Sequence, residues 1–362
     1  MTERKNKDQS ATAAGETAAE NSAAETAMTK TVDVAADAIG IDIGTSKIVT
    51  AVKKNDHIDY ASHRNAFIAV EYSNFTKRIL NQNQIKHHQI DNSLIVYGDG
   101  AETFADMLNS ETRRPMRQGL LNPNESHSVE IIKKAIDDLI DSTAINTGKL
   151  IFSVPDAPKD APTDIIYHES LLNRHLSNKG FTTRSINEGL AVVFAELEDE
   201  NFTGLGISAG GGMCNVCLAY LSIPLVTFSI TKGGDYLDDA VASVTGMVNT
   251  RVRSFKENGF DLKRTPRSSV EDALQVYYDD LIVTLVKALK QSIITTSNTN
   301  KVDRPIPVVL SGGTAKVSGF KDRFEQVLKA ENLPLDFSRI RVAKDPLTAT
   351  AKGALMAAMH EN

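Results

Sequence analysis

Two apolar hairpins with glycine-rich turns constrain the fold of this chain more than any other feature. Residues 39–52 read IGIDIGTSKIVTAV, and residues 205–219 read LGISAGGGMCNVCLA. In each segment strand-forming residues flank a turn of small residues, which predicts an antiparallel hairpin. Because glycine permits close backbone approach and positive φ, such turns can bind anions through their N–H groups.

A third glycine turn extends the pattern. The sequence Ser311-Gly312-Gly313-Thr314 follows an apolar run and precedes a helical one. A glycine turn before a helix suits contact with the phosphate or ribose of a nucleotide. The two hairpins lie about one domain length apart. This order predicts two similar halves whose hairpins face each other across a cleft.

Length and composition agree with two domains. The chain has 362 residues and a formal net charge of −6, with 41% hydrophobic and 24% charged residues. These values are typical of a soluble globular protein. The sequence has no apolar stretch long enough to span a membrane, and its acidic balance argues against direct nucleic-acid binding. Two cysteines cannot form a disulfide framework, so we expect a cytoplasmic protein.

Residues 1–36 differ from the rest because they consist mainly of Ala, Thr and Glu. Such a segment cannot bury enough apolar surface to offset its ordering entropy, which predicts a disordered tail. It is either a solvated extension or an arm that binds a partner, and its composition does not separate these roles.

Apolar periodicity predicts helices over residues 129–142, 237–252 and 272–292. Two further patterns resemble metal sites without supporting one. Cys214 and Cys217 would point to opposite faces of a strand, and they lack a second cysteine pair. His87 and His88 lie in a polar, loop-like stretch, where we expect them at the surface.

In these motifs and their order the chain resembles the actin/Hsp70 superfamily, and within it the bacterial actins of the MreB and MamK type. Residues 40–46 and 208–213 look like the two phosphate loops, and residues 310–314 look like the adenosine motif. The connecting helices are matched by residues 187–191 and 345–354, and the shorter stretches RPMRQG (114–119) and TKGGDYLD (231–238) also have counterparts.

The resemblance implies an α/β fold, the two-domain actin-like ATPase fold with duplicated ribonuclease-H-like domains around a nucleotide cleft. Domain I would comprise residues 37–187, with the C-terminal helix 346–362 returning to it. Domain II would comprise residues 188–345.

The resemblance also implies ATP and Mg²⁺ as cofactors. It assigns Asp42 to Mg²⁺, usually through water, and Glu188 to activation of the attacking water. Nucleotide contacts would come from Gly44, Thr45, Ser46, Lys47, Gly210, Gly211, Gly212, Met213, Asp235, Gly312, Gly313 and Thr314.

Three of these residues have a simpler alternative. Lys47 could be a solvated strand residue. A carboxylate such as Glu188 is favoured at a helix start by the dipole alone. Asp235 could serve as a helix N-cap.

The second phosphate loop departs from the family pattern. Relatives begin this loop with Asp, where this chain has Ser208, and they follow the glycines with Thr or Ser, where it has Met213 and Cys214. Loss of a carboxylate beside Mg²⁺ should weaken support of phosphoryl transfer. We therefore expect ATP hydrolysis to be slow or absent.

The function implied by the resemblance is that of a cytoskeletal protein that polymerises into filaments and organises cell shape or intracellular structures. Its main partner would be a second copy in a head-to-tail contact, which does not close on itself. A cytoplasmic or membrane-associated adaptor would be a further partner. Two alternatives remain, a nucleotide-binding scaffold without hydrolysis and a small-molecule kinase of the same superfamily, because one fold hosts all three functions.

Overall fold

The computed structural model describes residues 38–108, 110–161, 164–296, 302 and 304–360. The described residues form one compact unit. The predicted disordered tail, residues 1–36, lies outside the described residues. Below, residues 38–187 are called the first half and residues 188–360 the second half.

The first half is built around a five-stranded sheet in the order β10-β9-β1-β2-β3. Its strands are β1 (Ala38–Ile43), β2 (Lys47–Lys54), β3 (His57–Arg64), β9 (Gly148–Val154) and β10 (Phe181–Asn187). The predicted hairpin is the antiparallel pair β1–β2, and β9 runs parallel to β1 on its other side. Ile39, Ile41 and Ile43 alternate along β1 and are all buried in a core shared with helix α3 (Ser128–Thr143).

The second half repeats this arrangement in the order β13-β12-β11-β14-β15. The strands are β11 (Gly204–Ala209), β12 (Cys214–Tyr220), β13 (Ile223–Ile230), β14 (Ile306–Ser311) and β15 (Phe337–Val342). Again an antiparallel hairpin, β11–β12, is flanked by a third antiparallel strand and by a parallel strand. Both predicted hairpins and the internal similarity are confirmed.

Of the three predicted helices, two are confirmed and one is wrong. The helix predicted over residues 272–292 is α8 (Ser269–Thr295), and α3 confirms the one predicted over 129–142. The single helix predicted over 237–252 is wrong, because the chain forms α6 (Gly234–Thr245) and then α7 (Asn249–Glu257). Gly246 has φ 71° and ends α6 in the left-handed conformation that glycine adopts readily.

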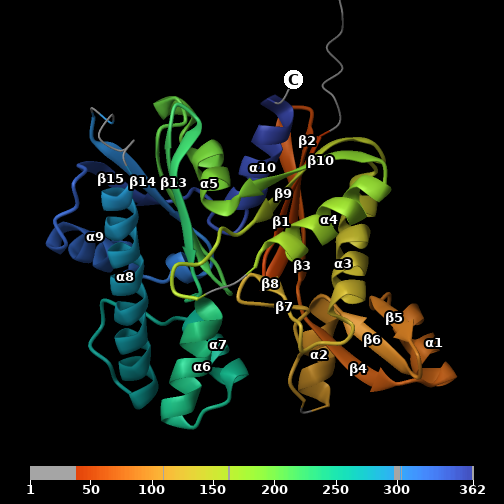
Figure 1. Cartoon of the computed structure of the whole chain (residues 1–362). Coiled ribbons are helices and arrows are strands. Elements are labelled where there is room, and N and C mark those ends of the chain that lie inside the picture. Colours follow the sequence, from red (N-terminus) through yellow and green to blue (C-terminus); the bar gives the residue numbers. More distant parts are fainter. Residues whose placement is uncertain (1–37, 109, 162–163, 297–301, 303, 361–362) are drawn as a thin grey trace, which may run out of the picture. The chain divides into compact units, whose positions relative to one another are not determined.

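Two helices pack against each other between the two large sheets (Figure 1). Helix α5 (Glu188–Glu196) contacts β11 and β12, and α10 (Ala349–His360) contacts β1 and β9. Their crossing is close, since a Cβ atom on Gly353 would lie 1.7 Å from the carbonyl oxygen of Ala191. Only glycine fits at this point of α10.

A smaller sheet, in the order β4-β6-β5, extends the first half. It consists of β4 (Phe67–Glu71), β5 (His87–Ile90) and β6 (Ser93–Tyr97), with α1 (Asn74–Gln82) and α2 (Asp99–Met107) nearby in sequence. The loop expected at His87 and His88 is wrong, because both residues belong to the edge strand β5. Pairing with β6 overrides the polar composition of the stretch.

The remaining elements are short or peripheral. They are β7 (Met116–Arg117), β8 (Leu120–Leu121), α4 (Ile166–Asn178), η1 (Glu198–Glu200), η3 (Thr314–Lys316) and α9 (Phe320–Ala330). Cys214 and Cys217 are both buried on β12, and burial raises the pKa of each thiol. Within the described ranges, no helix combines the length and apolar character needed to cross a bilayer.

His168 in α4 predicts how stability depends on pH. Its ring is buried, neither ring nitrogen has a hydrogen-bond partner among the described residues, and burial lowers its pKa from 6.5 to about 4. The unfolded chain therefore binds a proton more readily, and stability is lost as pH falls from 6.5 toward 4. The total loss is about 3 kcal/mol.

We expect the variant His168→Leu to lose less of its free energy of unfolding than the wild type between about pH 7.5 and about pH 5. Urea unfolding at both pH values measures the difference. The control is His57→Gln, because the His57 side chain is 66% exposed. Equal losses in the wild type and His168→Leu would contradict the prediction.

Candidate functional site

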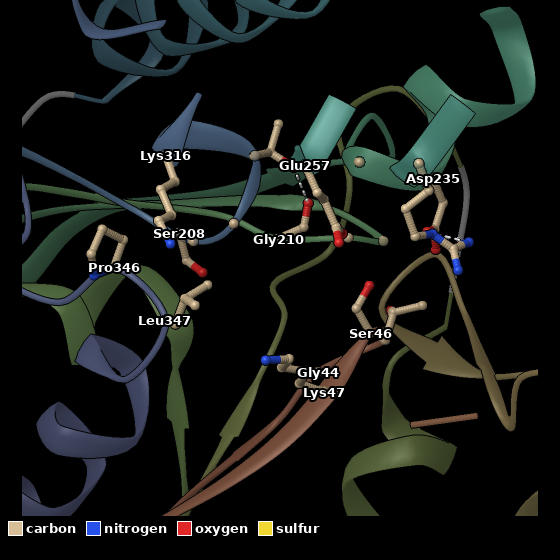
Figure 2. A pocket seen from close by; sticks show the side chains of 18 of the residues that line it. Gly44, Ser46, Lys47, Ser208, Gly210, Asp235, Glu257, Lys316, Pro346 and Leu347 are labelled. Atoms are coloured by element: carbon tan, nitrogen blue, oxygen red, sulfur yellow. Dashed lines mark hydrogen bonds and ion pairs between the residues drawn. The ribbon is translucent and has the colours of Figure 1, made fainter. Parts of the chain in front are cut away.

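A cavity of about 510 Å³ lies between the turns of the two glycine hairpins. Figure 2 shows Gly44, Ser46 and Lys47 on one side of it, and Ser208 and Gly210 on the other. All residues that the family resemblance assigned to nucleotide binding, metal binding or catalysis line this cavity. The structure thus brings together candidates from three separate turns and from the first turns of α5 and α6.

The first turn is fastened by Asn65, a residue that the sequence analysis did not identify. The Gly44 N–H donates to the Lys47 carbonyl at 3.0 Å, which closes the turn. The Asn65 side-chain amide donates to the Gly44 carbonyl at 2.9 Å, and its backbone N–H donates to the Ser46 carbonyl at 3.0 Å. These bonds fix the backbone of the turn at the edge of the cavity.

The second turn is held by its neighbours in the second half. Thr314 donates its hydroxyl to the Gly210 carbonyl at 2.8 Å, and the Gly234 N–H donates to the same oxygen at 3.0 Å. The Asp235 N–H donates to the Gly211 carbonyl at 2.8 Å. These bonds engage carbonyl oxygens that would otherwise repel a phosphate.

Glycine is required where the two turns meet. A Cβ atom on Gly211 would lie 2.0 Å from Ser46 Oγ, and one on Gly212 would lie 2.3 Å from Thr45 Oγ1. Any larger residue would push the hairpins apart. The glycines of the second turn therefore allow both hairpins to approach one ligand.

The third turn approaches the second in the same way. Gly312 has φ +91°, and a Cβ atom there would lie 2.1 Å from the Ala209 carbonyl oxygen. Beyond this turn the cavity is lined by a mixture of polar and apolar groups, as a base and ribose require. These residues are Glu257, Phe260, Lys316, Pro346 and Leu347.

Two carboxyl groups, the half-buried Asp42 and the buried Glu188, line the cavity. Asp42 Oδ1 accepts a hydrogen bond from Ser153 Oγ at 2.8 Å, and burial raises the pKa of Asp42 to about 6. Burial and then the charge of Asp42 raise the pKa of Glu188 to about 8. In the described part of the chain, no ion pair joins either group to a basic side chain. A cation between phosphate oxygens and Asp42 would fit this donor set.

Ser208 supports Glu188 directly. Its Oγ donates to Glu188 Oε2 at 3.0 Å. Asn215 on β12 also hydrogen-bonds Glu188 and lowers its pKa, and it accepts a hydrogen bond from Ser229 Oγ. The sequence did not indicate Asn215, because its role depends on the pairing of β11, β12 and β13.

Asp235 is neither free nor a helix cap. The N-cap of α6 is Gly233, so the N-cap interpretation of Asp235 is wrong. Its carboxylate instead accepts two hydrogen bonds from Arg114 Nη1, both at 2.9 Å. Arg114 also lines the cavity, and the sequence analysis quoted its motif without assigning it to the site.

Among the described residues, no three His, Cys, Asp or Glu side chains gather into a metal site. Lys47 lies at the start of β2 among the lining residues. Asp42 is the carboxylate that could share Mg²⁺ with phosphate oxygens and waters.

Comparisons with known proteins identify a matching family and solved structures with a similar fold. The model of the Volactin family matches residues 38–358. The MamK double helical filament aligns with a TM-score of 0.67 and 15% identity, covering 90% of this chain and 99% of that one. MreB5 of Spiroplasma citri bound to ADP aligns with a TM-score of 0.62 and 16% identity, covering 88% and 94%.

The ethanolamine utilization protein EutJ from Carboxydothermus hydrogenoformans is more distant, with a TM-score of 0.52, 16% identity and 88% coverage of each chain. No curated protein matches the sequence. At these identities the likeness concerns the fold. The predicted two-domain actin-like fold, of the bacterial MreB and MamK type, is confirmed.

Proposed function

Because this chain belongs to the Volactin family, we propose that it binds ATP with Mg²⁺ in the cavity between its glycine hairpins and assembles with further copies into filaments. One observation carries the proposal. Two close-packed glycine turns face a cavity of about 510 Å³ whose wall holds the half-buried carboxyl group of Asp42 and the buried one of Glu188. This combination of N–H-rich turns and carboxylates suits a polyphosphate with a divalent cation.

Each part of the cavity has a role in this proposal. The turns at residues 44–47 and 210–213 hold the phosphates, and the turn at residues 312–314 contacts the adenosine. Asp42 holds Mg²⁺, in part through water, and the cation neutralises phosphate charge. Glu188 orients the water that would attack the terminal phosphate.

Assembly is proposed from the fold. The neighbours described above include a filament and a nucleotide complex. A head-to-tail contact between copies is heterologous and does not close, so it permits a filament. In this proposal the protein acts in the cytoplasm, its main partner is a second copy, and a cytoplasmic or membrane-associated adaptor would bind the assembled filament.

Titration with a fluorescent ATP analogue tests the binding step. We expect saturable binding with Mg²⁺ and clearly weaker binding when EDTA removes the cation. Competition by unlabelled ATP controls for binding of the fluorophore. A protein that binds the analogue in neither condition would refute the nucleotide site.

A second candidate function, a nucleotide-binding scaffold with little or no turnover, is favoured by the state of Glu188. Burial and then the charge of Asp42 raise the pKa of Glu188, which disfavours the ionised form that would accept a proton from water. Ser208 also provides no negative charge to position a metal. In either function, we propose that ATP turnover is slow or absent.

The variant Ser208→Asp tests this account of slow turnover. A carboxylate at residue 208 would help to position Mg²⁺, so we expect phosphate release to rise by about 10-fold. Without Mg²⁺ a third buried carboxylate beside Asp42 and Glu188 should lower the melting temperature. Phosphate release and thermal unfolding, each with Mg²⁺ and with EDTA, measure both effects.

Ser208→Ala is the matched control, because it removes the hydroxyl without adding charge. We expect no gain in phosphate release from it. The account fails if the wild type already turns over as fast as Ser208→Asp.

A further inference from the structure

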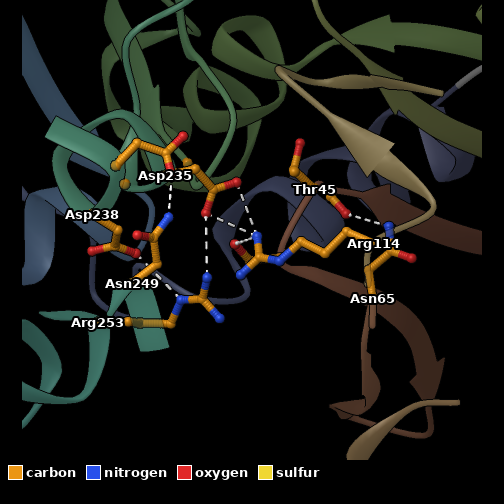
Figure 3. A network of polar contacts seen from close by, with 12 residues as sticks. Thr45, Asn65, Arg114, Asp235, Asp238, Asn249 and Arg253 are labelled. Carbon is orange, nitrogen blue, oxygen red and sulfur yellow. Dashed lines mark hydrogen bonds and ion pairs between the residues drawn. The ribbon is translucent and has the colours of Figure 1, made fainter. Parts of the chain in front are cut away.

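An arginine crosses the cavity from the first half to the second. Arg114 precedes β7, and its Nη1 donates to both carboxylate oxygens of Asp235 in the first turn of α6, at 2.9 Å each. Figure 3 shows Arg114 extending from one side toward Asp235 on the other. The two side chains are only 17% and 28% exposed. A partly desolvated ion pair of this kind interacts more strongly than one at the surface.

Arg114 also holds the first phosphate turn. The same Nη1 donates to Ser46 Oγ at 3.0 Å. A hydroxyl that accepts this bond still has its proton to donate. Arg114 therefore leaves the Ser46 hydroxyl able to donate to a phosphate oxygen.

The segment that carries Arg114 touches both hairpins at a second point. The Gly119 N–H, in the turn between β7 and β8, donates to Thr45 Oγ1 at 2.9 Å. A Cβ atom on Gly119 would lie 2.8 Å from Met213 Sδ in the second hairpin. Residues 114–119 thus contact both phosphate turns, and separating the hairpins would break these contacts.

The ion pair continues into the second half as a network (Figure 3). Arg253 Nε donates to Asp238 Oδ2 at 3.3 Å, and the buried Lys256 donates to Asp238 Oδ1 at 2.6 Å. Arg114, Arg253 and Lys256 line the cavity together with Asp235 and Asp238, which leaves one excess positive charge. Arg253 Nη2 also lies 4.0 Å from Asp235 Oδ1, so Asp235 has an arginine on each side.

We propose that Arg114 is a positioning residue that keeps the cavity closed, and that its ion pair with Asp235 slows the release of nucleotide. The inference rests on the proposed function, since the ligand retained is ATP. Closure holds the turns at residues 44–46 and 210–213 against the phosphates, whereas loss of the pair lets the two halves separate.

Nucleotide release tests the ion pair. For Arg114→Gln and for Asp235→Asn we expect a fluorescent ATP analogue to dissociate about 10-fold faster, which corresponds to about 1.4 kcal/mol. The double variant should be no faster than either single one, because the first substitution already breaks the pair. Stopped-flow measurements with excess unlabelled ATP give each rate.

Asp235→Asn separates this role from simple attraction of phosphate. It removes a negative charge from the cavity, so general attraction of phosphate predicts slower release of nucleotide. A broken ion pair predicts faster release. The charge-exchanged double variant, Arg114→Glu with Asp235→Lys, should return the rate toward the wild type. The control is Lys263→Gln, because Lys263 pairs with Asp322 at 2.7 Å on an exposed part of the second half.

Hydrogen exchange provides a readout without nucleotide. We expect the backbone amides of residues 210–213 to exchange faster in Arg114→Gln than in the wild type. Unchanged exchange and release, or additive effects of the two single substitutions, would overturn the inference. If the wild type binds no nucleotide, the proposed function fails, and the exchange measurement still decides whether Arg114 closes the cavity.

Discussion

Replacement of Asp42 by asparagine is expected to lower the affinity for ATP with Mg²⁺ by about 100-fold, or about 2.7 kcal/mol. The substitution keeps the size of the side chain and its bond from Ser153 but removes the charge that would hold the cation. Affinity in EDTA should change little, because the turn backbones remain. Titrations of the analogue with Mg²⁺ and with EDTA measure the two affinities.

The same substitution should stabilise the protein when no ligand is bound. Asp42 is half-buried and Glu188 is buried, and the charge of Asp42 raises the pKa of Glu188. Asparagine carries no charge, so the substitution removes both the cost of desolvating the Asp42 carboxylate and its repulsion of Glu188, and we expect a melting temperature in EDTA several degrees higher. A gain in stability with a loss of binding would indicate that Asp42 serves the ligand and not the fold.

Asp59→Asn is the matched control. Asp59 lies on the neighbouring strand β3, is 42% exposed and pairs with Lys54 at 3.1 Å. We expect it to change neither the affinity nor the melting temperature in EDTA. Equal Mg²⁺-dependent affinity in Asp42→Asn and the wild type would exclude Asp42 as the cation ligand.

Replacement of Gly353 by alanine is expected to destabilise the protein by about 3 kcal/mol or more. The added Cβ would lie 1.7 Å from the Ala191 carbonyl oxygen, and that oxygen belongs to the backbone of α5, which cannot rotate away. The helices must therefore separate, and with them the packing of α10 on the first sheet. Urea unfolding and the yield of soluble protein measure the loss.

Gly100→Ala controls for the general effect of replacing a helical glycine. A Cβ on Gly100 in α2 would meet only the side-chain methyls Ile85 Cγ2, at 3.0 Å, and Val96 Cγ1, at 3.6 Å. These side chains can shift, so we expect a small effect. An unchanged unfolding midpoint for Gly353→Ala would mean that α5 and α10 are not as close as described.

Features with a local chemical signature could be predicted from the sequence. The turns around Gly44, Gly211 and Gly312 require glycine for backbone approach, and alternating apolar residues mark the strands on either side. The resemblance carried by these turns indicated the candidate residues, and they line one cavity. The helix error has a local cause as well, since Gly246 carried the signal for a helix end and was passed over in favour of apolar periodicity.

Contacts between the two halves could not be predicted from local sequence patterns. Arg114 and Asp235 lie 121 positions apart, so their pairing depends on how the two sheets are placed around α5 and α10. Asn215 reaches Glu188 only because β12 pairs with β11. The strand at His87 was missed for the same reason, because its partner β6 supplies the hydrogen bonds that its polar sequence does not suggest.

Sedimentation with and without nucleotide tests most directly whether the cavity controls assembly. We predict that the wild type pellets as filaments, visible by electron microscopy, with ATP and Mg²⁺, and stays in the supernatant with EDTA. Asp42→Asn should remain in the supernatant in both conditions, whereas Asp59→Asn should behave as the wild type. A wild type that never pellets, or an Asp42→Asn variant that pellets equally well, would contradict the account.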